Sequence, residues 1–204
     1  MQLEFAHTYG DGREQSGENT VDAVSGLLYG APIDGYAALL MDAIPILNDM
    51  VGGVTVTVED DLTAMDATLV QGRTVTLYGE QAMHFVHARL GVGDGSNVAR
   101  MRRHRAYLHG FEQQLRARTA ENPQFVLELY AALSDYLITD ISSGTLSRIA
   151  QQCQGYENSG TLTLEGESRL GEKLMEFYPD ENALRGLVLD LFYEETPRDA
   201  YPEE

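Results

Sequence analysis

The segment from Val54 to Val58 consists of five consecutive β-branched residues and is the strongest strand signal in the chain. Two glycines directly before it close a short helical pattern over residues 43–51. A second short strand is predicted at Thr74–Leu77, and a helix follows it from Gly79 to Arg89. Because strands and helices alternate over this stretch, the sequence predicts an α/β layered fold.

The remaining segments complete one continuous chain of mixed elements. No internal repeat or low-complexity linker divides the 204 residues, so we expect a single domain. Amphipathic spacing and end signals predict further helices over residues 20–29, 98–117, 124–138, 145–153 and 181–193, and apolar runs predict strands over 36–41 and 161–164. In the long helix, the expected apolar stripe is Met101, Leu108, Phe111 and Leu115, with Arg100, Arg103, His104 and Tyr107 on an adjoining stripe.

Charge excludes some classes of partner. The chain has 32 acidic and 14 basic side chains and a net charge of -18, so its overall field repels nucleic acids and anionic membranes. Thirteen of the 14 basic residues are arginines, whose planar fork of donors suits phosphate or carboxylate groups. Half of the basic residues lie between Arg89 and Arg118, a stretch that contains two acidic residues. The sequence therefore predicts one local cationic region in an acidic protein.

Several common chemistries lack their residues. Cys153 is the one cysteine of the chain, so neither an intramolecular disulfide nor a paired-cysteine zinc site is expected. Serine-hydrolase, phosphate-loop and dinucleotide-binding motifs are absent. Uncharged runs such as residues 35–41 are far shorter than the ~20 residues of a membrane helix, and residues 1–20 lack a signal-peptide pattern.

The strongest candidate site joins two helix ends across a glycine-rich loop. His87 and Arg89 end one helix, residues 91–97 form the loop, and Arg100 and His104 open the next helix. These groups and the amides of the second helix could hold the oxygens of one diphosphate. A solvated arginine-rich face explains the spacing about equally well. A nucleic-acid recognition face is disfavoured by the total charge.

Two other groups of residues are weaker candidates. Glu59–Asp61 and Asp66 could gather a cation, but their spacing does not match a calcium loop and favours solvated charge. His7 with Tyr9 could line a site, although a lone histidine is more often a satisfied structural residue.

Three segments around the candidate site resemble a known family. "YAALLMDAIPILNDMVGGVTVTV", "LYGEQAMHFVHAR" and "GSNVARMRRHRAYL" are similar to the core of the LytR-CpsA-Psr family of cell-envelope proteins. "AHTYGDG", "SGENTVDAVSGLLYG" and "EFYPDENALRGLVLDLFYEE" are similar to clostridial members. The resemblance spans about residues 4–195 and implies one domain over residues 1–204, with a core at 4–118, a helical extension at 119–195 and a loose tail at 196–204.

The resemblance implies a fold and an activity. The fold would be a three-layer α-β-α sandwich with a central mixed sheet, here without its first strands. The activity would be that of a phosphotransferase, which moves an anionic glycopolymer (teichoic acid or capsular polysaccharide) from a polyprenyl diphosphate carrier to peptidoglycan. The resemblance places the domain on the extracytoplasmic face of the membrane, held by an N-terminal anchor that this chain lacks. It implies Mg²⁺ as cofactor, with ligands in an Arg-Asp segment that would lie upstream of Met1 and with none in this chain.

The resemblance also assigns site residues. Arg89 matches the second Arg of an Arg-x-Arg pair, Arg100 matches the Arg after the glycine loop, and both are expected to be catalytic. Arg103 matches a further recurrent Arg and is expected to bind diphosphate.

The remaining diphosphate-binding residues differ from the family pattern. His87 stands where the first Arg of the pair is usual, His104 where Gln is usual, and Asn97 where Asp is frequent. Since free imidazole titrates near pH 6.5, the two histidines are expected to make the charge of the site depend on pH. Because the metal-binding segment is absent, a non-catalytic polyprenyl-phosphate-binding module or a transcriptional attenuator-like regulator is the alternative.

Overall fold

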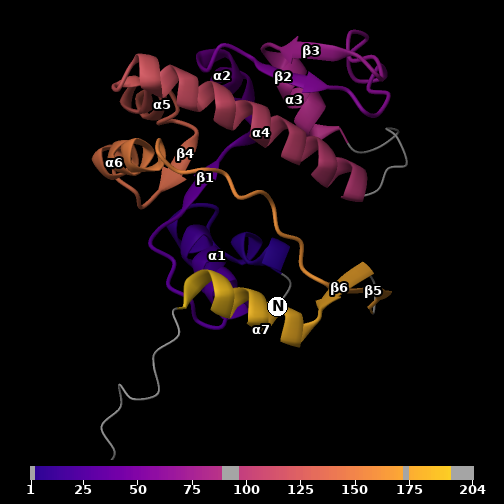
Figure 1. Cartoon of the computed structure of the whole chain (residues 1–204), viewed down its shortest axis with the longest axis vertical. Coiled ribbons are helices and arrows are strands. Elements are labelled where there is room, and N and C mark those ends of the chain that lie inside the picture. Colours follow the sequence, from indigo (N-terminus) through magenta and orange to yellow (C-terminus); the bar gives the residue numbers. More distant parts are fainter. Residues whose placement is uncertain (1–2, 89–96, 172–174, 194–204) are drawn as a thin grey trace, which may run out of the picture. The chain divides into compact units, whose positions relative to one another are not determined.

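A computed structural model describes residues 3–88, 97–171 and 175–193 (Figure 1). The chain divides into two compact units, which we treat separately. The central unit is Ala37–Tyr156, and the flanking unit combines Met1–Tyr36 with Glu157–Glu204. The single domain over residues 1–204 stays a prediction. None of the helices in the described ranges is long and apolar enough to cross a membrane.

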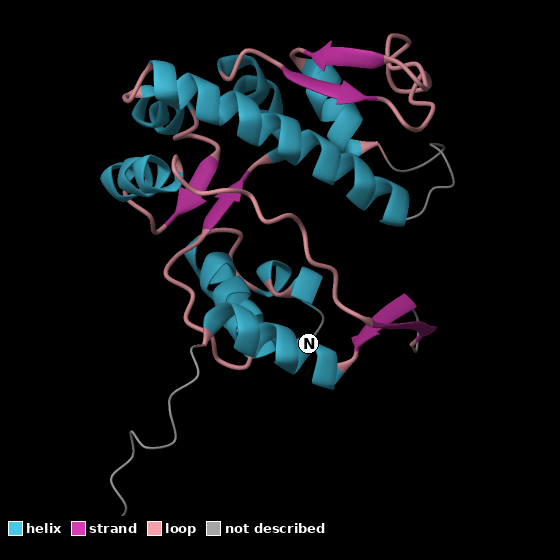
Figure 2. Cartoon of the chain, in the orientation of Figure 1, coloured by secondary structure: helices cyan, strands magenta, loops and turns pink. Residues whose placement is uncertain are grey.

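The α/β fold class is confirmed, since helices and short strands alternate along the chain (Figure 2). The strands of the described residues pair as three two-stranded antiparallel ladders, where the resemblance implied a central mixed sheet. The ladders are β1 (Ala37–Leu39) with β4 (Leu137–Thr139), β2 (Val54–Thr57) with β3 (Thr74–Leu77), and β5 (Gly166–Leu170) with β6 (Met175–Pro179).

The β2–β3 hairpin is the part of the fold that local sequence predicts best. Alternation along β2 buries Val54 and Val56 in the core of the central unit and leaves its threonines exposed. The exposed face is held by two cross-strand hydroxyl pairs, at 2.9 and 3.0 Å, formed by Thr55 with Thr76 and Thr57 with Thr74.

Helices pack against this hairpin to form the core of the central unit. They are α2 (Ile44–Met50), preceded by the 3-10 turn η3 (Met41–Ala43), α3 (Glu80–His87) and the long α4 (Asn97–Glu121). Helix α4 lies along β2 (Figure 1). The core side chains include Val51, Val54, Val58, Leu62, Leu69, Leu77, Phe85, Tyr107 and Phe125.

A buried polar network joins three of these elements. The Asn48 side chain of α2 donates to the Leu77 carbonyl of β3 at 2.8 Å, and the Tyr107 hydroxyl of α4 donates to the Asn48 Oδ1 at 3.4 Å. Burial, followed by the nearby Asp49 carboxylate, raises the pKa of Tyr107 above its ordinary value near 10. The hydroxyl therefore keeps its proton and remains a donor.

The apolar stripe predicted for α4 is confirmed at Phe111 and Leu115, which pack against the core, and is wrong at Met101 and Leu108, which are 46% and 61% exposed. The buried residues of α4 are Ala99, Arg103, Tyr107, Gly110 and Thr119. Two of them, Arg103 and Tyr107, belong to the stripe that was predicted beside the apolar one. Hydrophobic periodicity alone could not find these residues, because they include a charged residue that is paired in the fold and a glycine that lets the backbone approach β2.

The second half of the central unit differs from the sequence prediction at one boundary. Helix α5 covers Phe125–Ala132, whereas we predicted a helix to residue 138. The chain turns after Ala132, and Leu137–Thr139 pair with β1 instead, because a distant strand outcompetes the local helical pattern. Helix α6 (Ser143–Cys153) follows, and the Ser142 side chain caps it by accepting from the Thr145 amide at 3.1 Å.

The flanking unit contains two 3-10 turns, η1 (Leu3–Phe5) and η2 (His7–Tyr9), then α1 (Glu14–Leu27), the β5–β6 hairpin and α7 (Glu181–Phe192). Helix α1 begins six residues before its predicted start. The strand predicted at 161–164 is wrong, since that segment is a loop and the strands form further along the chain. Asp180 caps α7 as a favourable N-terminal residue, accepting from two amides at 2.9 Å.

Two helical glycines allow a matched test of packing. A Cβ at Gly110 of α4 would lie 2.8 Å from Val54 Cγ1 and 3.1 Å from the Thr55 carbonyl, whereas a Cβ at Gly186 of α7 meets nothing within 4 Å. We expect Gly110→Ala to destabilise the fold by about 1–3 kcal/mol through overpacking. Gly186→Ala should stabilise it by about 0.5–1 kcal/mol. Urea unfolding measures both, and equal effects would contradict the close approach of α4 to β2.

Candidate anion-binding site

The end of α3 and the beginning of α4 lie together in the central unit. The His104 Nε2 atom of α4 lies 2.9 Å from the carbonyl oxygen of Val86 in the last turn of α3. The Arg103 Nη2 group donates a hydrogen bond to the carbonyl of Ala88, the residue that follows α3. These two contacts bring the predicted flanks of the glycine loop into one place. Residues 89–96 lie outside the described ranges.

A buried ion pair supports this junction. Arg103 is 3% exposed, and its Nη1 lies 2.6 Å from the Oδ2 atom of Asp60, which is 8% exposed. Arg102 reaches the other oxygen of the same carboxylate at 3.2 Å and also pairs with Glu59. The charges of these two adjacent arginines of α4 are therefore balanced by the carboxylates of Glu59 and Asp60, in the segment that follows β2.

The predicted site residues differ in how far they are exposed, and one of them is outside the described ranges. Arg89 lies outside the described residues. His87 is exposed in the last turn of α3, and Asn97 is exposed as the first residue of α4. Arg100 and His104 are half-buried on the following turns. Since Asn97, Arg100 and His104 follow helical spacing, they share one face of α4 near its N-terminus.

Arg100 differs from its two arginine neighbours. Within the described residues no ion pair or hydrogen bond occupies its guanidinium, whereas Arg102 and Arg103 both face acidic partners. Arg100 lies in the first turn of α4, where the positive end of the helix dipole favours an anion. Its guanidinium can bind phosphate oxygens there.

The contact of His104 restricts what this side chain can donate. A carbonyl oxygen only accepts hydrogen bonds, so the contact with Val86 requires the proton of neutral imidazole to be on Nε2. The Nδ1 atom then carries a lone pair and cannot donate to a phosphate. His104 can donate to an anion through Nδ1 only when the ring is an imidazolium.

Asp60 is the functional residue that sequence reasoning missed. We predicted solvated charge for the acidic segment, and this is wrong for Asp60, which is buried and paired with Arg103. A signal was present, because Val58 and Leu62 are both fully buried and Asp60 lies at the position between them in the same alternation. An acidic residue at an inward position must find a cation.

The other acids of this segment stabilise their own loop. Asp61 accepts from the Thr63 amide at 3.0 Å, and Asp66 accepts from the amide of Thr68 at 2.9 Å. Hydrogen bonds from Thr63 lower the pKa of Asp61, and hydrogen bonds from Thr68, with a smaller contribution from His84, lower the pKa of Asp66. Among the described residues no group of three or more His, Cys, Asp or Glu side chains could hold a metal ion.

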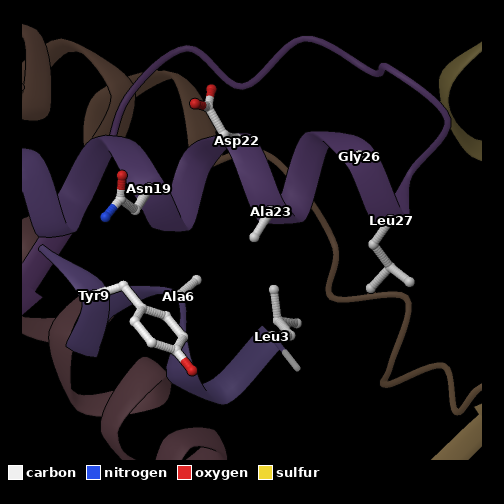
Figure 3. A pocket seen from close by; sticks show the side chains of 8 residues that line it. All are labelled: Leu3, Ala6, Tyr9, Asn19, Asp22, Ala23, Gly26 and Leu27. Carbon is white, nitrogen blue, oxygen red and sulfur yellow. The ribbon is translucent and has the colours of Figure 1, made fainter. Parts of the chain in front are cut away.

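Two of the cavities formed by the described residues lie away from this junction. In the central unit, a cavity of about 210 Å³ between the β1–β4 ladder and helices α5 and α6 is lined by apolar side chains, among them Leu39, Val126, Leu129, Leu133 and Leu146. In the flanking unit, a hollow of about 610 Å³ lies between α1 and the two 3-10 turns (Figure 3). Tyr9 lines this hollow together with Leu3, Ala6, Asn19, Asp22, Ala23, Gly26 and Leu27, whereas His7 is not among the lining residues.

Comparison with known proteins identifies the family. The model of the LytR_cpsA_psr family matches residues 2–187. The chain belongs to the LytR_cpsA_psr family. The match includes the α3–α4 junction and both cavities, and it confirms the resemblance found in the sequence. No curated protein sequence matches the chain.

Solved structures share the fold of this LytR_cpsA_psr chain. A transcriptional regulator of Enterococcus faecalis, EF0465, is 20% identical with a TM-score of 0.76, and the match covers 97% of this chain and 72% of that one. TagV of B. subtilis is 21% identical with a TM-score of 0.71, over 95% and 75% of the two chains. TagT bound to LI-WTA is 20% identical with a TM-score of 0.71, over 93% and 69%.

The ion pair leads to a stability prediction. Asp60→Ala should destabilise the protein by about 3–5 kcal/mol, because it leaves the Arg103 guanidinium buried without its carboxylate. Glu59→Ala removes a carboxylate that is 47% exposed and should change stability by less than about 1 kcal/mol. Chemical denaturation of the two variants measures the difference. Equal stability of the two variants would contradict a buried pair.

Proposed function

We propose that this chain is the phosphotransferase-type domain of a cell-wall assembly protein. In this proposal it attaches an anionic glycopolymer, a teichoic acid or capsular polysaccharide, from a polyprenyl diphosphate carrier to peptidoglycan on the extracytoplasmic face of the membrane. The observation that carries the proposal is the family match over residues 2–187, nearly the whole chain. The structural likeness to TagT bound to LI-WTA supports a lipid-linked polymer as the ligand.

The residues at the α3–α4 junction suit the charge changes of this reaction. A hydroxyl oxygen of peptidoglycan would attack the phosphorus that carries the glycopolymer, and the bond from that phosphorus to the bridging oxygen would break. Prenyl phosphate would leave with the bonding electrons and take up the hydroxyl proton. Negative charge grows on the bridging oxygen in such a step, and positioned cations and amides stabilise it.

Roles follow from position. Arg100, at the positive end of the α4 dipole, would bind the diphosphate oxygens, with Arg89 as the second catalytic arginine of the proposal. Asn97 would donate from the same face of α4, and His87 from the end of α3. His104 would add a donor in its imidazolium form.

The prenyl chain needs an apolar environment. We propose that a distal part of the chain occupies the 210 Å³ cavity of the central unit, because the lining is mostly aliphatic. Helix α5 of this lining begins beyond the C-terminal end of α4, about 30 Å along that helix from Arg100. The Ala37 and Leu39 side chains of β1 form one wall, and residues of α5 and α6 form the other. The lipid would then contribute affinity through apolar burial.

A non-catalytic binding or regulatory module is the second candidate. The fold is shared with a protein that is named a transcriptional regulator, EF0465. The net charge of -18 argues against direct contact with nucleic acid. Release of prenyl phosphate from a lipid-linked polymer separates the two candidates, since a module binds without turnover.

Arg100 provides the direct test of the head-group site. Arg100→Ala should weaken binding of geranyl diphosphate by roughly 10- to 100-fold, since a hydrogen bond to a charged group contributes about 1.5–3 kcal/mol. Arg148→Ala, which removes an exposed arginine of α6, is the charge-matched control and should bind like wild type. Calorimetric titration gives both constants. Wild-type affinity in Arg100→Ala would exclude Arg100 from the site.

The cavity predicts a dependence on the lipid chain. A prenyl diphosphate long enough to reach the cavity, such as undecaprenyl diphosphate, should bind more tightly than inorganic diphosphate, because each buried CH₂ contributes about 0.8 kcal/mol. Ala37→Leu, which fills part of the cavity, should reduce this gain and leave affinity for inorganic diphosphate unchanged. Ala38→Leu on the opposite face of β1 is the control, and an equal loss in both variants would argue against the cavity.

A further inference from the structure

We propose that the buried Arg103–Asp60 pair positions the diphosphate site without contacting the ligand. The inference rests on the proposed function, because it gives these two residues a role in the same site. Arg103 was expected to bind diphosphate directly. The structure instead shows its donors directed inward, with Nη1 on Asp60 at 2.6 Å and Nη2 on the Ala88 carbonyl.

Burial separates Arg103 from any ligand in solvent. The residue is 3% exposed, and a diphosphate would have to replace the Asp60 carboxylate to reach its guanidinium. That carboxylate is itself held by Arg102 at 3.2 Å. Displacing it would leave a buried carboxylate without one of its two cations, which costs several kcal/mol.

The pair joins the three segments on which the site is built. Asp60 is anchored to the core by Val58 and Leu62, both fully buried. Ala88 directly follows His87, the last residue of α3. Arg103 lies one helical turn after Arg100 on the same face of α4. Through Arg103, the first turns of α4 are therefore fixed against the end of α3 and against the segment after β2.

Stability alone explains this arrangement poorly. The Arg103 Nε atom is buried, and the described residues leave this one donor of the guanidinium without a hydrogen-bond partner. Apolar residues of similar volume often replace a buried ion pair at no cost in stability. What apolar residues cannot supply is a directed bond to the Ala88 carbonyl, which sets the distance between the two helix ends.

The neighbouring residues Asp60 and Asp61 allow a test of the positioning role, because positioning and simple electrostatics predict opposite changes in diphosphate affinity for Asp60→Asn. Asp60→Asn and Asp61→Asn each remove one negative charge from the same segment. Asp61 is exposed, and its carboxylate accepts a hydrogen bond from the Thr63 amide of its own loop. Electrostatics alone predicts slightly tighter binding of inorganic diphosphate in both variants. Positioning predicts that Asp60→Asn weakens binding about tenfold while Asp61→Asn stays within about twofold of wild type. Affinities come from NMR titration, with circular dichroism melting to confirm folding.

A double-mutant cycle separates positioning from a general loss of structure. If the pair acts by placing Arg100, Asp60→Asn should cause no further loss of affinity in the Arg100→Ala background. Additive losses would mean that the pair acts independently of Arg100 and would overturn the proposal. Arg103→Lys provides a second test if Asp60→Asn does not fold, because an ammonium keeps the charge but cannot span Asp60 and Ala88 as a fork.

The outcomes distinguish this inference from the proposed function. A loss in Arg103→Lys similar to that in Asp60→Asn supports positioning. Wild-type affinity in a folded Arg103→Lys, or equal affinities of Asp60→Asn and Asp61→Asn, would overturn the positioning role and leave the proposed function intact. If the wild-type chain binds neither inorganic nor geranyl diphosphate, the proposed function fails and the positioning role fails with it.

Discussion

The ion pair between Arg103 and Asp60 determines how the central unit is assembled around α4. A guanidinium that is 3% exposed requires a carboxylate at one particular place, so the rotation of α4 about its axis cannot change without leaving a buried charge unpaired. The loop after β2 must also close in one way, with Leu62 and Leu69 both fully buried beneath it. The rotation of α4 then decides that Tyr107 reaches the Asn48 side chain and that Gly110 faces β2. One electrostatic contact thus selects among the apolar packings that the hydrophobic effect alone would allow.

Local sequence predicted those elements whose residues have one strong preference. Strand β2 is β-branched throughout, and α3 and α7 combine amphipathic spacing with clear ends, so their boundaries were predicted within two residues. Strand β4 could not be predicted, because Leu137 and Ile138 continue the helical pattern of α5 and become a strand only by pairing with Ala38 and Leu39 about one hundred residues earlier. Part of the buried face of α4 was missed for the same reason. Its Arg103 is compatible with the core only because Asp60, distant in sequence, is there to meet it.

For the candidate site, the sequence likewise predicted which residues are involved but not what each of them does. Its residues were named from the sequence, since a glycine-rich loop between two helix ends with arginines is a local pattern. Their roles were not separable at that level, because Arg100, Arg102 and Arg103 have identical chemistry and differ only in the partners that the fold brings to them. Arg102 fits the interpretation as an ordinary ion-paired surface residue, with Glu59 beside it. Arg103 is buried and connects α4 to Asp60 and to the Ala88 carbonyl. Arg100 lies in the first turn of α4 without an acidic partner among the described residues.

The distribution of paired charges along α4 also limits the kind of anion that can bind. Arg116 faces Glu112 at 2.9 Å and Arg118 faces Glu121 at 3.6 Å, while Arg102 and Arg103 are paired with the segment after β2. The helix is therefore not a continuous basic stripe of the kind that follows the regularly spaced phosphates of a nucleic acid. What remains is a short cationic region around Arg100 at the N-terminal end of α4, in a chain whose net charge is -18. Such a region can stabilise a compact diphosphate, and the surrounding negative field disfavours a nucleic acid lying along the helix.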